Sequence, residues 1–213
     1  MPPAVVCVGS SGWPILSGRR FGPCRRPPSA TFAVNASGFK FCPRCRAPLV
    51  EAERGGRARL VCADDRCGFV HWNNPVPVVA AIVERDGRVI LVRNRGYPPT
   101  WYVLVAGFLE PNETPEQAVL REVEEELGLP GELVAPVGAY PFERLNQIIF
   151  AYHVRLAPGE IRLCDAELVD YKAVPIENLR PWPQGTGPAL RDWLAARGRF
   201  PPIVALGAEM PKT

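Results

Sequence analysis

Residues 107–129 read GFLEPNETPEQAVLREVEEELGL and carry the strongest structural signal in the chain. Thr114 offers a hydroxyl for an N-cap, Pro115 suits the first helical position, and Gln117 completes a capping box. Gly128 can adopt the left-handed conformation that ends many helices. The sequence therefore predicts a helix that begins at Pro115 and ends just before Gly128.

Apolar and acidic side chains fall on different sides of this helix. At 100° per residue, one arc faces the core and holds the apolar residues Val119, Leu120, Val123 and Leu127. A second arc holds Glu122, Glu125 and Glu126. In water such a face is simply solvated, since neighbouring like charges cost about 1 kcal/mol or less. In a cleft each repulsion rises to about 4 kcal/mol, and a hard cation such as Mg²⁺ or Mn²⁺ is then required.

The same segment resembles a complete Nudix box. It fills every position that the motif specifies, in the order Gly107-x5-Glu113-x7-Arg121-Glu122-Val123-Glu124-Glu125-Glu126-Leu127-Gly128-Leu129. The resemblance implies an α/β fold, an α/β/α sandwich around a mixed sheet. It also implies metal-assisted attack of water on the phosphorus of a nucleoside diphosphate that is linked to another moiety.

Roles for individual residues follow from the resemblance. Glu122 and Glu126 would be the principal ligands of Mg²⁺ or Mn²⁺, Glu125 a ligand or a partner of the base, and Gly107 a ligand through its carbonyl group. A carboxylate would take the proton of the attacking water, and the carboxylate that does so varies across the family.

Three further positions near the box are candidates for the site. Arg121 would form a buried pair with Glu113 and orient the helix. Glu167 resembles a late glutamate that some members add as ligand or base, although a glutamate before a strand is equally a surface residue. Phe142 and Arg144 suit stacking on a base and pairing with a phosphate, or they are ordinary residues at the start of a strand.

Four cysteines form a second pattern. Cys42 and Cys45 make one close pair, and Cys62 and Cys67 make another after a hairpin-sized spacer. This spacing is typical of a tetrahedral zinc site with no open coordination position, so the zinc would be structural. Four reduced cysteines are the alternative, and His71 is either a competing ligand or a packed side chain.

Further elements are predicted around these two motifs. The strands are expected at Val76–Val83, Arg88–Arg93, Trp101–Ala106, Asn146–Leu156 and Val169–Val174, and a final helix at Pro188–Ala196. An Asp-Gly turn joins the first two strands. The expected domains are a disordered segment at 1–38, a zinc ribbon at 39–74, the Nudix domain at 75–199 and a loose tail at 200–213.

Composition limits the partners. The longest apolar stretches are far shorter than the roughly 18 residues that a membrane span needs. Residues 1–50 hold seven Lys or Arg and no acid, whereas the remainder has a net charge of −4, which disfavours nucleic acid as the main partner. Seven cysteines indicate a reducing compartment, and we expect a cytoplasmic protein. Residues 1–38 also resemble an organellar transit peptide, with a dispensable tail or a start-site error as the alternatives.

A zinc ribbon followed by a Nudix domain narrows the expected substrate. NADH pyrophosphatases share this arrangement, and residues 67–75, CGFVHWNNP, are similar to their ribbon exit. Their motif after the box is replaced here by GAYPFERLNQ at 138–147, which favours shorter hydrolases of ADP-ribose or FAD. We expect a Mg²⁺-dependent pyrophosphatase that releases AMP. The alternatives are a nucleoside triphosphate pyrophosphohydrolase and a non-catalytic nucleotide sensor or adaptor. Relatives are commonly homodimers.

Overall fold

A six-stranded mixed sheet forms the body of the protein in the computed structural model, which describes residues 38–207. Its strand order is β7-β8-β4-β5-β9, and β6 pairs with β4. The strands are β4 (Val76–Arg85), β5 (Arg88–Asn94), β6 (Val105–Phe108), β7 (Gly131–Phe142), β8 (Gln147–Leu156) and β9 (Leu168–Pro175). The β4–β8 pair is parallel and the others are antiparallel.

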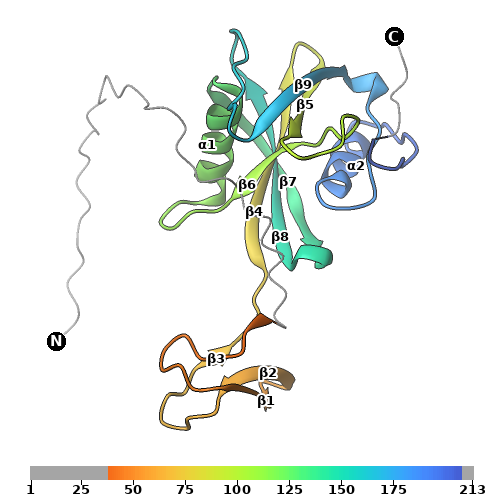
Figure 1. Cartoon of the computed structure of the whole chain (residues 1–213). Helices are drawn as coiled ribbons and strands as arrows, with labels where there is room; N and C mark the ends of the chain where they lie inside the picture. The colour runs from red at the N-terminus through yellow and green to blue at the C-terminus, as the bar shows by residue number, and fades with distance from the viewer. Residues whose placement is uncertain (1–37, 208–213) are drawn as a thin grey trace, which may run out of the picture.

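Two helices complete the sandwich (Figure 1). They are α1 (Pro115–Leu127) and α2 (Gly187–Ala195). Val79 and Val83 of β4 belong to the same buried cluster as the apolar face of α1, whereas Ile82 belongs to the cluster that contains α2. Because side chains alternate across a strand, the two helices cover opposite faces of the sheet. The expected α/β/α sandwich with a mixed sheet is confirmed.

The hairpin between β4 and β5 forms as predicted. Asp86 and Gly87 have φ angles of 52° and 68°, as a turn with two left-handed residues requires. The strand expected from Trp101 begins only at Val105. Before that point a single isolated bridge joins Val103 to Val92. Continuous strand pairing therefore starts only where β6 lies beside β4.

The long strand β7 has no counterpart among the sequence predictions. It contains Pro136 and Pro141, which argue against a central strand because proline cannot donate a ladder hydrogen bond. The structure places β7 at the edge of the sheet, beside β8, with two register irregularities. An edge position tolerates both prolines.

Two short 3₁₀ helices, η2 (Glu143–Leu145) and η3 (Ile176–Asn178), follow β7 and β9. The segment expected to be a loose tail from residue 200 packs onto the body as far as it is described. Val204 donates a backbone hydrogen bond to Pro181 (2.9 Å), and Leu206 packs against the α2 cluster. The remainder of that segment, and residues 1–37, lie outside the described residues.

The cysteine-rich segment folds into a small antiparallel sheet, which Figure 1 shows beyond one end of β4. Its strands are β1 (Leu49–Arg54), β2 (Arg57–Cys62) and β3 (Val70–His71). Gly55 and Gly56 make the β1–β2 turn with φ angles of 61° and 73°, which is why two glycines stand there. No helix among residues 38–207 is long and apolar enough to span a bilayer.

An asparagine clamp joins this small sheet to the body. Asn146, in a left-handed conformation, donates from its side-chain amide to Asn73 Oδ1 (3.0 Å). Its carbonyl accepts from the backbone N–H of Val76 (2.8 Å). Asn73 and Val76, which flank the connection between the small sheet and β4, are therefore both hydrogen-bonded to the residue that precedes β8.

Candidate active site

The helix α1 forms with the predicted boundaries. Thr114 Oγ1 accepts from the backbone of Gln117 (3.3 Å), and Gln117 Oε1 accepts from the backbone of Thr114 (2.8 Å). At the other end Gly128 has a φ of 69° and donates to the Glu124 carbonyl (2.9 Å). The capping box and the glycine stop thus fix which residues of the segment are helical.

The three glutamates expected on one face differ in their surroundings. Glu122 and Glu126 are buried, with exposed fractions of 2% and 3%, whereas the Glu125 side chain is 44% exposed. The acidic arc is therefore not a uniformly solvated face. Two carboxylates lie inside the protein next to the apolar side of α1, and burying a charge needs compensation from partners.

Arg121 supplies much of that compensation. Its Nε and Nη2 donate to both oxygens of Glu113 (2.9 and 2.6 Å), which is the bidentate geometry that suits a guanidinium. Its Nη1 donates to Glu122 (2.7 Å) and Glu125 (3.1 Å), and Nη2 also reaches the Phe108 carbonyl (3.1 Å). Hydrogen bonding to Glu113 is the main cause that raises the pKa of Arg121. The expected Arg121–Glu113 pair is present and partly buried.

Gly107 lies against the Glu122 carboxylate. It is opposite Val79 in the β4–β6 ladder, and a Cβ built on it would lie 2.1 Å from Glu122 Cδ. No real contact is that short, so glycine is required for the backbone to approach this carboxylate. The strand β6 thus delivers the first residue of the motif to the acidic side chains of the helix.

Glu126 is a buried carboxyl group whose pKa is strongly perturbed. Burial, followed by the charge of Glu122 and then that of Glu167, raises its pKa well above the ordinary value. Its Oε2 atom is buried and has no hydrogen-bond partner. An unsatisfied buried carboxylate oxygen is costly, so it marks a place where a cation or a proton is expected.

Glu167 lies close enough to act on Glu126 electrostatically. The backbone holds it there, because Arg95 donates to the Glu167 carbonyl (2.6 Å) and Glu167 donates to the Cys164 carbonyl (3.0 Å). Cys164 belongs to the same surroundings, since it is buried and its N–H donates to the Glu126 carbonyl (3.1 Å). No sequence pattern predicts a role for Cys164, which stands three residues before Glu167 in the chain.

The structure leaves Phe142 and Arg144 apart from this set. Phe142 is half-buried and packs against the cluster of Val78, Ala80 and Ile149. Arg144 is exposed in η2. Within residues 38–207, no hydrogen bond or ion pair joins either side chain to α1, and their contact with a substrate stays a prediction.

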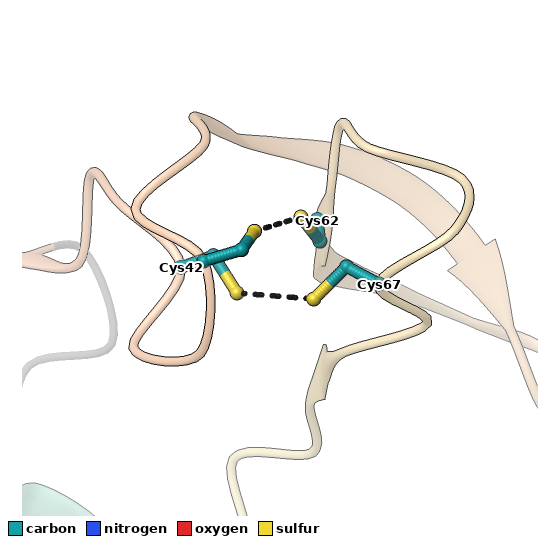
Figure 2. Close-up of side chains that lie close together, drawn as sticks. Cys42, Cys62 and Cys67 are labelled. Carbon is teal, nitrogen blue, oxygen red and sulfur yellow. Dashed lines mark hydrogen bonds between the residues drawn. The ribbon is translucent and has the colours of Figure 1, made fainter.

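Four cysteines in and beside the small sheet converge, and Figure 2 labels three of them, Cys42, Cys62 and Cys67. Cys42 and Cys67 have sulfur atoms 3.6 Å apart, those of Cys45 and Cys62 are 3.4 Å apart, and all four lie within 4.8 Å of one another. Within residues 38–207 this is the only such group of three or more His, Cys, Asp or Glu. Backbone N–H groups donate to Cys42 and Cys62 (both 3.4 Å), which stabilises thiolates.

The thiols of this group differ in pKa, and burial raises the pKa of Cys62 to about 12. Burial raises the pKa of Cys42, but backbone hydrogen bonds outweigh it and lower that pKa to about 7. His71 lies outside the group, because its ring packs against Phe39 at a centroid distance of 4.9 Å. The packed alternative for His71 is therefore the one observed.

Comparison with known proteins places this geometry in a family. Residues 74–196 match the NUDIX domain model, so the chain belongs to the Nudix family. A solved NUDIX hydrolase from Nitrosomonas europaea superposes with a TM-score of 0.59 at 22% identity, over 78% of this chain and 99% of that one, which shows the shared fold.

Two curated relatives are more specific. The NAD-capped RNA hydrolase NudC of Stutzerimonas stutzeri is 33% identical over 69% of this chain and 52% of its own length. The NAD-capped RNA hydrolase NUDT12 of Homo sapiens is 34% identical over 63% of this chain and 30% of its own. The chain thus spans about half the length of the bacterial relative and less than a third of the human one.

Proposed function

We propose that this protein is a metal-dependent Nudix pyrophosphatase. Its substrate would be a nucleoside diphosphate linked to another moiety, of the ADP-ribose, FAD or NADH type, and one product would be AMP. The observation that carries the proposal is the burial of Glu122 and Glu126 within the complete motif. Arg121 donates a hydrogen bond to Glu122, and Glu167 lies close enough to Glu126 to raise its pKa. Buried carboxylates of this kind are expected in a site that binds cations and transfers protons.

The residues present fit a hard divalent cation. Glu126 has a buried oxygen without a partner, and Glu122 and Glu125 each accept a hydrogen bond from Arg121 Nη1. Glu122, Glu125, Glu126 and the Gly107 carbonyl would hold Mg²⁺ or Mn²⁺, for which oxygen ligands are preferred. When bound, the ion would neutralise diphosphate oxygens and lower the pKa of the attacking water.

The protein's own groups would then position and deprotonate. Arg121 would keep the carboxylates of Glu113 and Glu122 in place through its five donors. The proton of the water would pass to Glu125, Glu126 or Glu167, which are the carboxylates gathered at the site. Phe142 and Arg144 would contact the base and a phosphate at the far end of the substrate.

The cysteine group would hold a structural zinc. Four sulfur atoms within 4.8 Å of one another match a closed tetrahedral set. We retain the division into a ribbon at 39–74 and a catalytic domain at 75–199.

The relatives favour the NADH member of the substrate class and add a second candidate. NudC and NUDT12 are both named as hydrolases of NAD-capped RNA, which is the second candidate. An NAD cap contains the same pyrophosphate bond as NADH, so one site of this kind could serve either substrate. NADH and NAD-capped RNA are both nucleoside diphosphates linked to another moiety.

Turnover of a defined panel tests the proposal. ADP-ribose, FAD, NADH, NAD-capped RNA and nucleoside triphosphates would be incubated with and without Mg²⁺, and the products separated by chromatography. We expect AMP from an ADP-linked compound only with the metal. Turnover of triphosphates alone would support the pyrophosphohydrolase alternative, and no turnover would support the nucleotide sensor.

The substitution Glu126→Gln links the activity to this residue. We expect the rate to fall at least about 100-fold, the usual contribution of a positioned acid or base. Thermal stability should stay equal or rise, because the change removes a buried charge without a partner for Oε2. Glu124→Gln is the matched control, since Glu124 is exposed on the same helix, and it should retain activity. Full activity of Glu126→Gln would contradict the assignment.

A further inference from the structure

The small sheet separates charge between its two faces. Residues that pair across an antiparallel sheet share a face, so the β1–β2 register places Arg54 opposite Arg57 and Ala52 opposite Arg59 on one face. The same register places Glu51 and Glu53 on the other face, with their partners Leu60 and Ala58. The three strand arginines therefore lie on one face, and both strand glutamates lie on the opposite one.

Apolar and aromatic groups occupy the rest of the arginine face. Val50, Val61 and Val70 pair in a row across the three strands on that face. Trp72, just after β3, is 49% exposed, and the Arg59 guanidinium lies 4.8 Å from its ring centroid. This places one large aromatic surface beside positive charge, which is the usual arrangement for binding unpaired bases.

Within residues 38–207, no carboxylate neutralises the positive charges of this face. Arg54 donates to the Glu53 carbonyl and Arg59 to the carbonyls of Arg54 and Trp72. Among the described residues none of Arg54, Arg57 and Arg59 forms an ion pair with a carboxylate. Cys62 shares the opposite face with Leu49, so the sulfur atom of this strand also lies away from the arginines.

We propose that the arginine face of the ribbon, made of Arg54, Arg57, Arg59 and Trp72, binds a single-stranded RNA segment. The arginines would pair with successive phosphates and Trp72 would stack on a base. This deepens the proposed function, on which it rests for the link to catalysis, because it assigns a site to the polynucleotide part of a capped substrate. The net charge of −4 outside residues 1–50 concealed this face, because pleating separates arginines and glutamates that lie close together along the sequence.

Direct binding tests the proposal without relying on turnover. Full-length protein carrying Glu126→Gln would be titrated into a fluorescein-labelled oligouridine of about 12 nucleotides, a length within the usual range of single-strand sites. We expect the triple variant R54Q/R57Q/R59Q to weaken binding at least about 10-fold. It should also lower the slope of log affinity against log salt by about 2, as expected for three lost phosphate contacts. W72A should weaken binding at least about 5-fold through lost stacking.

Controls separate this role from folding and from catalysis. The double variant R155Q/R162Q removes two exposed arginines of the body and should bind RNA normally. R54Q/R57Q changes only exposed side chains and should show an intermediate loss with unchanged zinc content. In otherwise wild-type protein, the triple variant should keep NADH turnover while losing turnover of capped RNA.

Three results would overturn the proposal. The first is a triple variant with the RNA affinity and salt slope of the wild type, and the second is a parent protein that does not bind RNA. The third is a parent protein that forms a concentration-dependent dimer, when the triple variant loses this dimer and not RNA binding. The last result would make this face a contact between copies of the chain. If RNA binds through the face but no substrate is turned over, the inference stands and the proposed pyrophosphatase activity fails.

Discussion

The ribbon and the carboxylate site both gather acidic ligand groups, but the structure organises them in different ways. In the ribbon, four sulfur atoms lie within 4.8 Å of one another, and few residues of the segment are buried. In the body, the carboxylates of α1 are attached to a helix whose other side lies in a large apolar core. Arg121 already satisfies part of their charge.

The difference concerns where the free energy of folding comes from. We expect a segment of this size with a small core to depend on an ion to fold, so its ligands and its fold would be inseparable. The helix α1 is held by Val119, Val123 and Leu127, which are fully buried, and it would keep its place with or without a cation. A metal in the ribbon would therefore be part of the structure, and one at α1 would serve function.

Removing a ribbon ligand gives the largest expected effect. Cys62→Ser should abolish zinc binding and unfold residues 39–74, since structural zinc contributes on the order of 10 kcal/mol to such a fold. The body should retain its thermal transition. Zinc content and hydrogen exchange measure the two effects, and Cys164→Ser, which changes the buried cysteine of the body, should keep the zinc. An ordered, zinc-free ribbon would remove the contrast between the regions.

The reverse behaviour is expected when the carboxylate site is altered. Gly107→Ala inserts a Cβ where the Glu122 carboxylate lies, so that side chain must move. We expect activity to fall about 100-fold, as a displacement of about 1 Å in a site can do. Stability should fall by only about 1–3 kcal/mol, the usual cost of overpacking. The turnover rate and the free energy of unfolding, measured for variant and wild type, check these two expectations. Gly56→Ala is unsuitable as a control, because Gly56 has a positive φ.

The smallest expected effect is a pH dependence of the body's stability that comes from His153, a residue outside both sites. His153 is buried between Glu84 (2.8 Å) and Arg197 (3.5 Å). Burial lowers its pKa below the ordinary 6.5, with Arg197 and Arg155 acting in the same direction against the hydrogen bond to Glu84. Below about pH 6.5 the unfolded chain takes up a proton that the folded protein resists, so stability falls as pH drops toward the lower pKa.

The slope from this group is at most about 1.4 kcal/mol per pH unit. Urea unfolding of the wild type and of His153→Gln at several pH values isolates it, because glutamine can still bond to Glu84. We expect a weaker acid destabilisation in the variant. Identical pH dependence of the two proteins would exclude His153 as a source.

Much of the fold was predictable because the signals are local. The capping box at Thr114, the Gly128 stop and the Asp86–Gly87 turn act within a few residues, and all three form as the sequence indicates. The strand β7 was missed because Pro136 and Pro141 disfavour strands in general. Only the position of β7 at the sheet edge makes them acceptable, and that position depends on pairing with β8.

The sequence by itself determined the family motif, the helix that bears it and the two cysteine pairs, because each depends on residue types at short, fixed spacings. Only the tertiary structure decided that Glu122 and Glu126 are buried while Glu125 is exposed, and that Glu167 and Cys164 lie near Glu126. It also decided that the ribbon arginines share one face. These are properties of the surroundings of a side chain, and surroundings arise when segments distant in the chain pack together.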